Sequence, residues 1–336
     1  MTETFSRQPS VMITGGAGYI GSHLALLLQN HGYRLVIIDN LSTGNAWAVP
    51  EEASLIVADI LDTATLVTAM KEHRIQTVIH FAAKSNVPES FAKPDDFFET
   101  NVNGTKSVID ACATAGVKQL LFSSTAAVYG NATHGLVDEG APLQPISPYG
   151  QSKLEAEQII QKTCSLQEIR HVTFRFFNVV GAHPSGVIGQ YNPTSCHLLQ
   201  KCFNCVREGG ELTVFGHDFQ TPDGTAERDY IHVQDLASLH LQAMKYLDGG
   251  GESLLLNAGY GSSHSVLEFI KVFQHVTNSV FPYHFASRRE GDPASLIADV
   301  TRLGQVLEWS PEHTSLEQMI GSSWLWENSL KRKELG

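Results

Sequence analysis

The fold is decided by the stretch Val11-Met12-Ile13-Thr14-Gly15-Gly16-Ala17-Gly18-Tyr19-Ile20-Gly21. A short apolar run typical of a buried strand leads into a glycine-rich turn, and the apolar residues of positions 20–28 recur at helical spacing. Glycines between a strand and a helix let backbone N–H groups approach a pyrophosphate, and the helix N-terminus favours its negative charge. The stretch therefore predicts a dinucleotide-binding turn.

The alternation of strand and helix continues through the first half of the chain. Helices are expected at about 102–115 and 154–162, and strands at 35–38, 55–57, 77–81, 119–122 and 172–177. Continuous apolar strands separated by helices are typical of a parallel sheet covered on both faces. We predict an α/β fold, a doubly wound parallel sheet (Rossmann), with a smaller C-terminal substrate-binding domain.

The predicted domains divide the chain near its middle. Residues 1–177 are assigned to the cofactor-binding domain and residues 178–336 mainly to the substrate-binding domain, because glycine- and proline-rich turns replace the regular alternation there. Residues 230–260 are expected to return to the main sheet. The chain from Val266 onwards is expected to form mostly the smaller domain.

Length, charge and cysteine usage narrow the class of protein. The chain has 336 residues and a formal net charge of −12, which argues against nucleic acid or an anionic membrane as partner and favours a small molecule. The first residues do not resemble a signal peptide, and no segment approaches the ~18 apolar residues of a membrane span. Five scattered cysteines suit reduced thiols, so we expect a cytoplasmic location.

Two of the cysteines, Cys202 and Cys205, have the spacing of a metal-binding pair, with Cys196-His197 nearby. The same spacing places both on one helical face beside Leu199 and Phe203. The buried helical face is the favoured interpretation, and no metal is predicted.

The predicted cofactor is NAD. Gly15, Gly18 and Gly21 have the spacing of a dinucleotide-binding turn, and Asp39 follows about 20 residues later at the end of the second strand. A carboxylate there accepts hydrogen bonds from the adenosine ribose and repels a 2′-phosphate, which disfavours NADP. The alternative is a turn that serves only packing, with Asp39 as a strand-end cap. The predicted cofactor-binding residues are Gly15, Gly18, Tyr19, Ile20, Gly21, Asp39, Asn40, Asp59, Ile60, Phe81, Ala82, Ala83, Asn101, Ser123, Tyr149, Lys153 and Phe176.

A tyrosine and a lysine four residues apart, Tyr149 and Lys153, share one face if this segment is helical. Bringing a phenol pKa from ~10 to near neutrality requires ~4 kcal/mol. One positive charge ~5 Å away supplies roughly 3 kcal/mol at an effective dielectric of ~20. Lys153 is therefore expected to lower the pKa of Tyr149. By itself this pair also fits a solvated helix.

A hydroxyl run, Ser123-Ser124-Thr125, ends the fifth strand, at the edge where open α/β sheets bind ligands. There Thr125 can bond a substrate oxygen and pass its proton to Tyr149. Such a run also occurs as a strand cap. With Tyr149 and Lys153 it forms the catalytic set of a short-chain dehydrogenase/reductase.

Several longer runs carry a resemblance that extends from about Val11 to about Trp326. The chain resembles the UDP-glucose 4-epimerases of the extended short-chain dehydrogenase/reductase family. The runs are Thr14–His23, Ala126-Ala127-Val128-Tyr129-Gly130, Tyr149-Gly150-Gln151-Ser152-Lys153, Phe177-Asn178, Gly181-Ala182-His183-Pro184-Ser185-Gly186 and Arg228-Asp229-Tyr230-Ile231-His232-Val233.

The resemblance implies interconversion of UDP-galactose and UDP-glucose with a tightly held NAD+. Tyr149 takes the 4-hydroxyl proton through Thr125, C4 is oxidised, and the resulting 4-keto sugar turns before it is reduced on its other face. A homodimer is expected by the same resemblance. The implied diphosphate contacts are Asn178, Arg228 and Arg289, and the implied uridine contacts are Phe215 and Tyr230. Thr125 and Asp292 are also implied to bind the substrate. Leu296 stands at the position that limits the size of the sugar 2-substituent.

The chain departs from the family pattern at three places. Ser195-Cys196-His197 replaces an Asn-Asn-Leu segment, Lys84 falls one place early relative to the lysine of the family's segment, and Val179 follows Asn178 in place of proline. Without the resemblance, Arg228 and Arg289 also fit surface ion pairs with Asp229 and Asp292.

Four alternative functions are weighed against UDP-galactose/UDP-glucose interconversion. They are a 4-epimerase of UDP-N-acetylglucosamine, UDP-xylose or UDP-glucuronate, a nucleotide-sugar dehydratase, an NADP-dependent reductase, and an NAD-sensing binding module. The dehydratase is disfavoured because Ala126-Ala127 stands where its Asp-Glu pair is required. The reductase is disfavoured by Asp39, and the binding module by the complete catalytic set.

Overall fold

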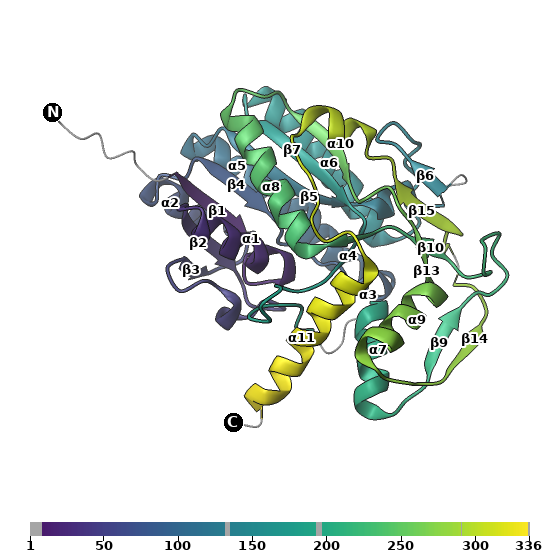
Figure 1. Ribbon diagram of the computed structural model, residues 1–336. Coiled ribbons are helices and arrows are strands. Elements are labelled where there is room, and N and C mark those ends of the chain that lie inside the picture. Colours follow the sequence, from purple (N-terminus) through teal and green to yellow (C-terminus); the bar gives the residue numbers. More distant parts are fainter. Residues whose placement is uncertain (1–8, 132–134, 193–196, 290, 335–336) are drawn as a thin grey trace.

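The computed structural model describes residues 9–131, 135–192, 197–289 and 291–334 (Figure 1). These residues include a seven-stranded sheet in which all neighbouring strands are parallel, in the order β12-β7-β5-β4-β1-β2-β3. The strands are β1 (Ser10–Thr14), β2 (Arg34–Asp39), β3 (Ser54–Val57), β4 (Thr77–His80), β5 (Gln119–Thr125), β7 (Arg170–Phe176) and β12 (Leu254–Ala258). The predicted doubly wound parallel sheet is confirmed.

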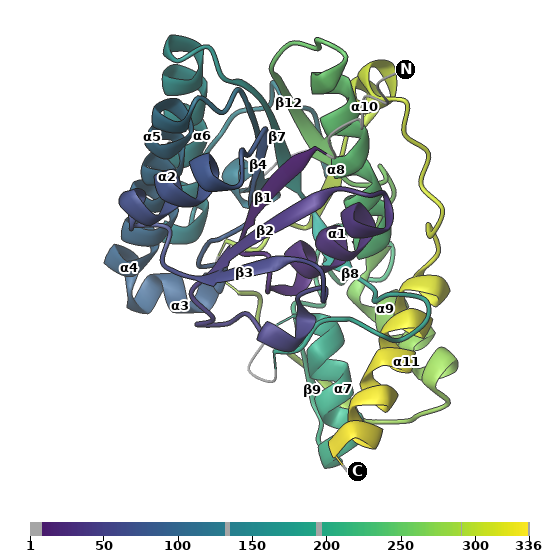
Figure 2. The ribbon, with the colours of Figure 1, turned by 90° about the vertical axis from the view of Figure 1, so that its left-hand side faces the viewer.

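Helices cover both faces of this sheet (Figure 2). Successive residues of β1 point to opposite faces, so that Val11 and Ile13 belong to one core cluster and Met12 to the other. The first cluster is covered by α1 (Tyr19–Asn30), α8 (Val233–Asp248) and α10 (Thr301–Val306), and the second by α2 (Thr63–Glu72), α5 (Gly104–Ala115) and α6 (Pro148–Leu166). Burial on both faces explains why the strands are apolar throughout.

The helix that carries Tyr149 is longer than predicted. It begins at Pro148 rather than near residue 154, because proline suits the first helical position and the Ser147 side chain accepts a hydrogen bond from the Gly150 amide. Tyr149 therefore lies in the first turn of α6.

The helix predicted at 102–115 has two parts, a π-helical turn η2 (Glu99–Asn103) and α5.

The smaller part of the molecule lies beside the carboxyl ends of the main strands. Its core contains α7 (Leu198–Glu208), α9 (Val266–Thr277) and α11 (Leu316–Glu334). Its strands form three small sheets, β13-β10-β15-β6, β11-β8 and β14-β9. They are β6 (Gly135–Val137), β8 (Asn178–Val180), β9 (Leu212–Phe215), β10 (Glu227–Arg228), β11 (Tyr230–His232), β13 (His264–Ser265), β14 (Tyr283–Ala286) and β15 (Ser295–Ala298), and the remaining short helices are η1 (Ala46–Ala48), α3 (Val87–Ala92), α4 (Pro94–Phe98) and η3 (Ala126–Tyr129).

The chain crosses the predicted boundary at residue 177 in both directions. The expected return of residues 230–260 is observed, since α8 packs on the main sheet and β12 pairs with β7. Two crossings were not predicted: β6 pairs with β15 of the smaller part, and α10 packs on the main sheet through Leu303. The exact domain division stays a prediction. Within the described ranges, no helix is both long and apolar enough to span a membrane.

Candidate active site

The predicted site residues gather at the carboxyl edge of the main sheet. Thr14, Asp39, Thr125 and Phe176 are the last residues of β1, β2, β5 and β7. The strand order reverses between β1 and β4, and ligands of open α/β sheets bind at such a point. The topology therefore brings the glycine turn and the hydroxyl run to one cleft-forming edge.

The glycine turn is packed backbone against backbone. Gly15 has a φ of 72°, and a Cβ there would lie 2.5 Å from the Ala82 amide nitrogen. A Cβ on Gly21 would lie 2.8 Å from the Gly16 Cα. Helix α1 begins at Tyr19 with no side-chain cap from Gly18, so its first N–H groups are oriented toward an incoming anion. This arrangement fits the pyrophosphate of a dinucleotide.

Asp39 is buried at the end of β2 and holds the glycine turn in place. Its carboxylate accepts hydrogen bonds from the Ala17 amide at 3.0 Å and the Leu41 amide at 2.8 Å. The strand-end cap considered from the sequence is therefore present. Each carboxylate oxygen has a second lone pair, so this role is compatible with binding a ribose hydroxyl. Beside it, Asn40 donates a hydrogen bond to Asp59 at 2.8 Å.

The three predicted catalytic residues come together from two elements. Thr125 ends β5, and Tyr149 and Lys153 occupy successive turns of α6. The Thr125 hydroxyl accepts a hydrogen bond from the Ala127 amide at 3.1 Å and is hydrogen-bonded to Tyr149. Lys153 is 3% exposed, with its Nζ 4.3 Å from the centre of the Phe122 ring.

The expected lowering of the Tyr149 pKa is wrong for the protein alone. Burial raises the pKa of Tyr149, and the hydrogen bond from Thr125 opposes this only in part. Burial also lowers the pKa of Lys153 to about 7, against the effect of the Glu157 carboxylate. Attraction between the two groups favours their charged forms, but both side chains lose their hydration on burial, and this loss has the larger effect on each pKa.

Three predicted cofactor-binding residues form internal contacts. Asn101 accepts a hydrogen bond from the Lys84 amide at 2.8 Å and donates to the Lys84 carbonyl at 3.0 Å and to Ser152 at 2.9 Å. Ser123 donates to the His80 carbonyl at 3.0 Å, and Ile60 is buried against α5. The Lys84 ammonium lies 3.5 Å from the Asp96 carboxylate, and both side chains are partly exposed.

An aromatic wall stands beside the fourth and seventh strands. The Phe81 and Phe176 rings lie 6.3 Å apart, and each contacts the buried ring of His240. Ala82 follows Phe81, and the amides of both donate to the Thr14 carbonyl. These rings form an apolar cluster next to the glycine turn, and their predicted place on the nicotinamide side stays a prediction.

The predicted substrate residues of the smaller part form two sets of contacts, one around Phe215 and one between β10 and β15. The Arg289 guanidinium lies 4.0 Å from the centre of the Phe215 ring. Arg228 is paired with Leu296 in the sheet register and forms an ion pair of 3.2 Å with Asp292. One of the two ion-pair partners suggested from the sequence is thus observed.

The other suggested partner, Asp229, forms no ion pair with either arginine. Asp229 lies between β10 and β11, and its buried carboxylate accepts hydrogen bonds from the amides of Tyr260, Gly261 and Ala298. Tyr230 is 4% exposed and packs 5.0 Å from the Phe269 ring. Asn178 lies exposed at the start of β8, beside Tyr230 in the register.

Sequence reasoning missed a buried ion pair between Glu157 and Arg175. Its oxygen and nitrogen atoms, Oε2 and the terminal Nη2, are 2.8 Å apart. Two signals point to it: Glu157 follows Lys153 at helical spacing, and Arg175 interrupts an otherwise apolar strand. A charged residue in a buried strand requires a partner.

The cysteine pair lies in the core of the smaller part. Cys202 and Cys205 are buried with Leu199 and Phe203, as favoured from the sequence. Ser195 and Cys196 lie outside the described residues. Across the part of the chain that the structure describes, no group of three or more His, Cys, Asp or Glu side chains is arranged to hold a metal.

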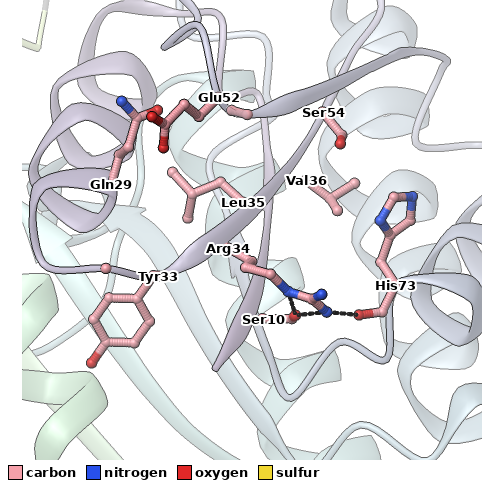
Figure 3. A pocket seen from close by; sticks show the side chains of 11 residues that line it. Ser10, Gln29, Tyr33, Arg34, Leu35, Val36, Glu52, Ser54 and His73 are labelled. Carbon is pink, nitrogen blue, oxygen red and sulfur yellow. Dashed lines mark hydrogen bonds between the residues drawn. The ribbon is translucent and has the colours of Figure 1, made fainter. Parts of the chain in front are cut away.

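A separate cavity lies at the amino ends of β1 and β2, at the edge opposite the site (Figure 3). Its Arg34 guanidinium donates hydrogen bonds to Ser10 at 2.9 Å and to the His73 carbonyl at 3.5 Å. The cavity contains none of the predicted catalytic or binding residues. It is not part of the candidate active site.

Comparison with known proteins gives the family. The sequence matches the NAD dependent epimerase/dehydratase family over residues 11–259. The chain belongs to this family. Its relative from Azospirillum brasilense, a UDP-glucose 4-epimerase, is 42% identical over 99% of this chain and 96% of the relative.

Solved structures of the family have the same fold. The UDP-glucose-4-epimerase from Stenotrophomonas maltophila, with bound NAD and formylated UDP-arabinopyranose, superposes with a TM-score of 0.93 at 38% identity, covering 97% of this chain and 100% of that one. The UDP-Glc/GlcNAc 4-epimerase from Campylobacter jejuni has a TM-score of 0.84 at 35% identity, covering 96% and 99%. The cofactor of the family is NAD, which the glycine turn and Asp39 fit.

Proposed function

We propose that the protein interconverts UDP-galactose and UDP-glucose with a tightly bound NAD+, as an isomerase that consumes no added cofactor. The observation that carries this proposal is the placement of Thr125, Tyr149 and Lys153 at the sheet edge that also holds the glycine turn. Arg228 and Arg289 on the smaller part supply positive charge for a diphosphate.

Each residue has a distinct role in the proposed reaction. Tyr149 accepts the proton of the sugar 4-hydroxyl, and Thr125, hydrogen-bonded to it, bridges to that hydroxyl. NAD+, when bound, would accept the C4 hydride and later return it, and its positive charge would favour ionisation of Tyr149. The Lys153 ammonium favours the phenolate that burial alone disfavours.

The nucleotide has to be held firmly while the sugar turns. The proposed diphosphate-binding residues are Arg228, Asn178 and Arg289, whose guanidinium lies over the Phe215 ring. Binding energy from this remote part positions a sugar that itself makes few contacts. Reduction of the turned 4-keto sugar then inverts C4.

The test uses purified protein and UDP-galactose without added NAD, in deuterated buffer, with the product read by proton NMR. We expect UDP-glucose that carries protium at C4, because the hydrogen removed from C4 is the one returned. Deuterium at C4, or conversion only with stoichiometric NAD, would contradict the proposal.

A second candidate substrate is UDP-N-acetylglucosamine. Leu296, half-buried on β15 beside Arg228, is intermediate in size between tyrosine and cysteine, and the Campylobacter jejuni neighbour is named for both sugars. The same NMR assay with UDP-N-acetylglucosamine, UDP-xylose and UDP-glucuronate ranks these alternatives. The dehydratase stays disfavoured because Ala126 and Ala127 begin η3, where no carboxylate is available.

The homodimer and the cytoplasmic location stay predictions. Sedimentation of the purified protein tests the first, and fractionation of the source cells tests the second. A UDP-sugar is the proposed small-molecule partner.

A further inference from the structure

A buried ion pair lies directly behind the proposed catalytic residues. Glu157 follows Lys153 by one helical turn on α6, and Arg175 lies on β7. Their side chains are 6% and 2% exposed, and two hydrogen bonds join them, at 2.8 Å and 3.1 Å. The pair is bidentate, which fixes its geometry as well as its charge.

The pair connects the catalytic helix to the catalytic strand. Ser124, the residue before Thr125, donates a hydrogen bond to the same Glu157 oxygen that accepts from Arg175. In the sheet register Ser124 is the neighbour of Arg175, so β5, β7 and α6 meet at this carboxylate. Glu157 therefore joins the strand that carries Thr125 to the helix that carries Tyr149.

The network extends to the edge of the sheet. Arg175 donates to the Tyr129 hydroxyl at 3.0 Å, and Tyr129 donates to Asn257 on β12 at 2.6 Å. Asn257 in turn donates to the Val137 carbonyl of β6, in the smaller part, at 2.8 Å. All these side chains are buried, so water does not compete for the hydrogen bonds.

Glu157 also acts on the charge of Lys153. The groups that act on Lys153 are Glu157 from its own helix, the Phe122 ring from β5 and the neutral His80 from β4, and Tyr149 lies one turn earlier on the same helix. The Phe122 ring and the Glu157 carboxylate both favour the ammonium over the amine, and of these two groups Glu157 is the one that carries a charge. Removal of this carboxylate makes Lys153 lose its proton at a lower pH.

A buried ion pair is weak as a source of stability, because the desolvation of two charges offsets their attraction. We propose that Glu157 is a positioning residue for the proposed epimerase reaction. Held by Arg175, its carboxylate joins α6 to β5 through Ser124, which keeps Thr125 and Tyr149 in register, and it supplies negative charge one helical turn from Lys153. This inference rests on the proposed function.

The test compares Glu157→Gln with Glu157→Asp and with Glu155→Gln as matched control on the same helix. For Glu157→Gln we expect kcat to fall on the order of 10²-fold while KM for the UDP-sugar changes little, because the nucleotide contacts are untouched. In the plot of kcat against pH, the decrease on the alkaline side (the alkaline limb) should move to lower pH by about one unit, because Lys153 loses its proton more easily without the carboxylate. Glu157→Asp should return the limb toward its wild-type position, and Glu155→Gln should behave as wild type.

A variant of a buried pair can fail to fold, because Arg175 is left without a partner. The double variant Glu157→Gln/Arg175→Gln removes both charges and keeps hydrogen-bonding groups, and it should show the same shift of the alkaline limb. A fall in kcat with an unmoved limb in both variants would overturn the proposal and leave a purely structural role.

A readout independent of turnover separates this inference from the proposed function. Proteins with ¹³C-labelled lysine report the titration of Lys153 by NMR, with Lys153→Arg assigning the signal. We expect the Lys153 pKa to be lower in Glu157→Gln than in the wild type. An unchanged pKa overturns the inference even if the enzyme epimerises, whereas a wild type without epimerase activity overturns the proposed function alone.

Discussion

At Tyr149 the decisive quantity is the free energy of ionising a phenol that has lost most of its water. Burial raises its pKa, and the Thr125 hydrogen bond recovers part of the cost. Burial therefore opposes the loss of the phenol proton, so the proposed reaction requires positive charge near this oxygen.

Replacement of the phenol tests its role directly. Tyr149→Phe should lower kcat/KM by about 10²- to 10⁴-fold, because a general base is lost while shape is kept. The bound nucleotide content, measured by absorbance after denaturation, should be unchanged. Tyr33→Phe, at the amino edge of the sheet, is the control and should retain activity. Full activity of Tyr149→Phe would remove the phenol from the mechanism.

At the scale of elements, the glycine turn depends on close backbone packing between β1, α1 and the chain after β4. The Thr14 carbonyl accepts hydrogen bonds from Phe81 and Ala82, and Gly15 leaves no room for a side chain against Ala82. The turn has the shape of a cofactor cradle before any cofactor binds. Its sequence requirements are therefore steric.

A single methyl group should disrupt this cradle. Gly21→Ala places a Cβ 2.8 Å from the Gly16 Cα, so the turn must shift and NAD should be lost during gel filtration. Gly304→Ala in α10 is the control, because no atom lies within 4 Å of its added Cβ. There alanine should stabilise by about 0.5–1 kcal/mol. Retention of NAD by Gly21→Ala would show that the turn tolerates displacement.

At the scale of the whole molecule, an aromatic cluster joins the two parts of the chain. Trp47 on η1, close to Asp39 in sequence, contacts Tyr191 at 5.9 Å and Trp326 of α11 at 5.6 Å between ring centres. The Trp326 indole also donates to the Gln190 carbonyl at 2.8 Å. The loop that follows Asp39 is thereby attached to the smaller part.

Loss of the cluster should weaken both stability and cofactor retention. Trp47 is 51% exposed, so Trp47→Ala should lower the free energy of unfolding by only about 1–2 kcal/mol, measured by urea titration. NAD should dissociate faster, measured by stopped-flow transfer to a scavenging dehydrogenase. Val280→Ala, at a side chain 95% exposed, serves as control. An unchanged NAD dissociation rate would limit the cluster to a stability role.

Buried histidines make the molecule sensitive to acid. Burial lowers the pKa of His23 and His240 to about 4 and of His80 and His232 to about 3. Below the unfolded value of ~6.5 the unfolded chain binds protons that the native protein excludes, so stability is present above pH ~6.5 and is lost as pH falls toward 4. Urea midpoints should decrease across this window.

His240→Leu tests one member of the set. Its ring is enclosed by Phe81, Phe174 and Phe176, where an apolar side chain is suited to the surroundings. Between pH ~6.5 and ~4 the free energy of unfolding of the variant should depend less steeply on pH than that of the wild type. The difference corresponds to up to one proton, about 1.4 kcal/mol per pH unit. Val280→Ala, which removes no titratable group, provides the control, and its slope should match the wild type. Equal slopes in all three proteins would contradict this assignment.

Much of the fold follows from local patterns. Apolar strands, the glycine turn and the helix between them depend on spacings within a few residues, so the seven main strands and the return of β12 were predictable. The placement of β6 beside β15 was not, because Gly135–Val137 is too short to show a pattern and pairs with residues 161 positions away. Likewise the start of α6 was set by Ser147 and Pro148, outside the apolar spacing used to predict it.

The candidate site, like the fold, has features that the sequence predicts and features that depend on tertiary structure. The amino-acid sequence by itself determined which residue types reach the carboxyl edge, since strand ends and helical spacing place Thr125, Tyr149, Lys153 and Asp39 there. Only the tertiary structure decided how the surroundings change the properties of these residues: burial raises the pKa of Tyr149, and Glu157 of α6 forms an ion pair with Arg175 of β7. Desolvation and long-range pairing depend on every neighbour in space, and a linear pattern records only neighbours along the chain.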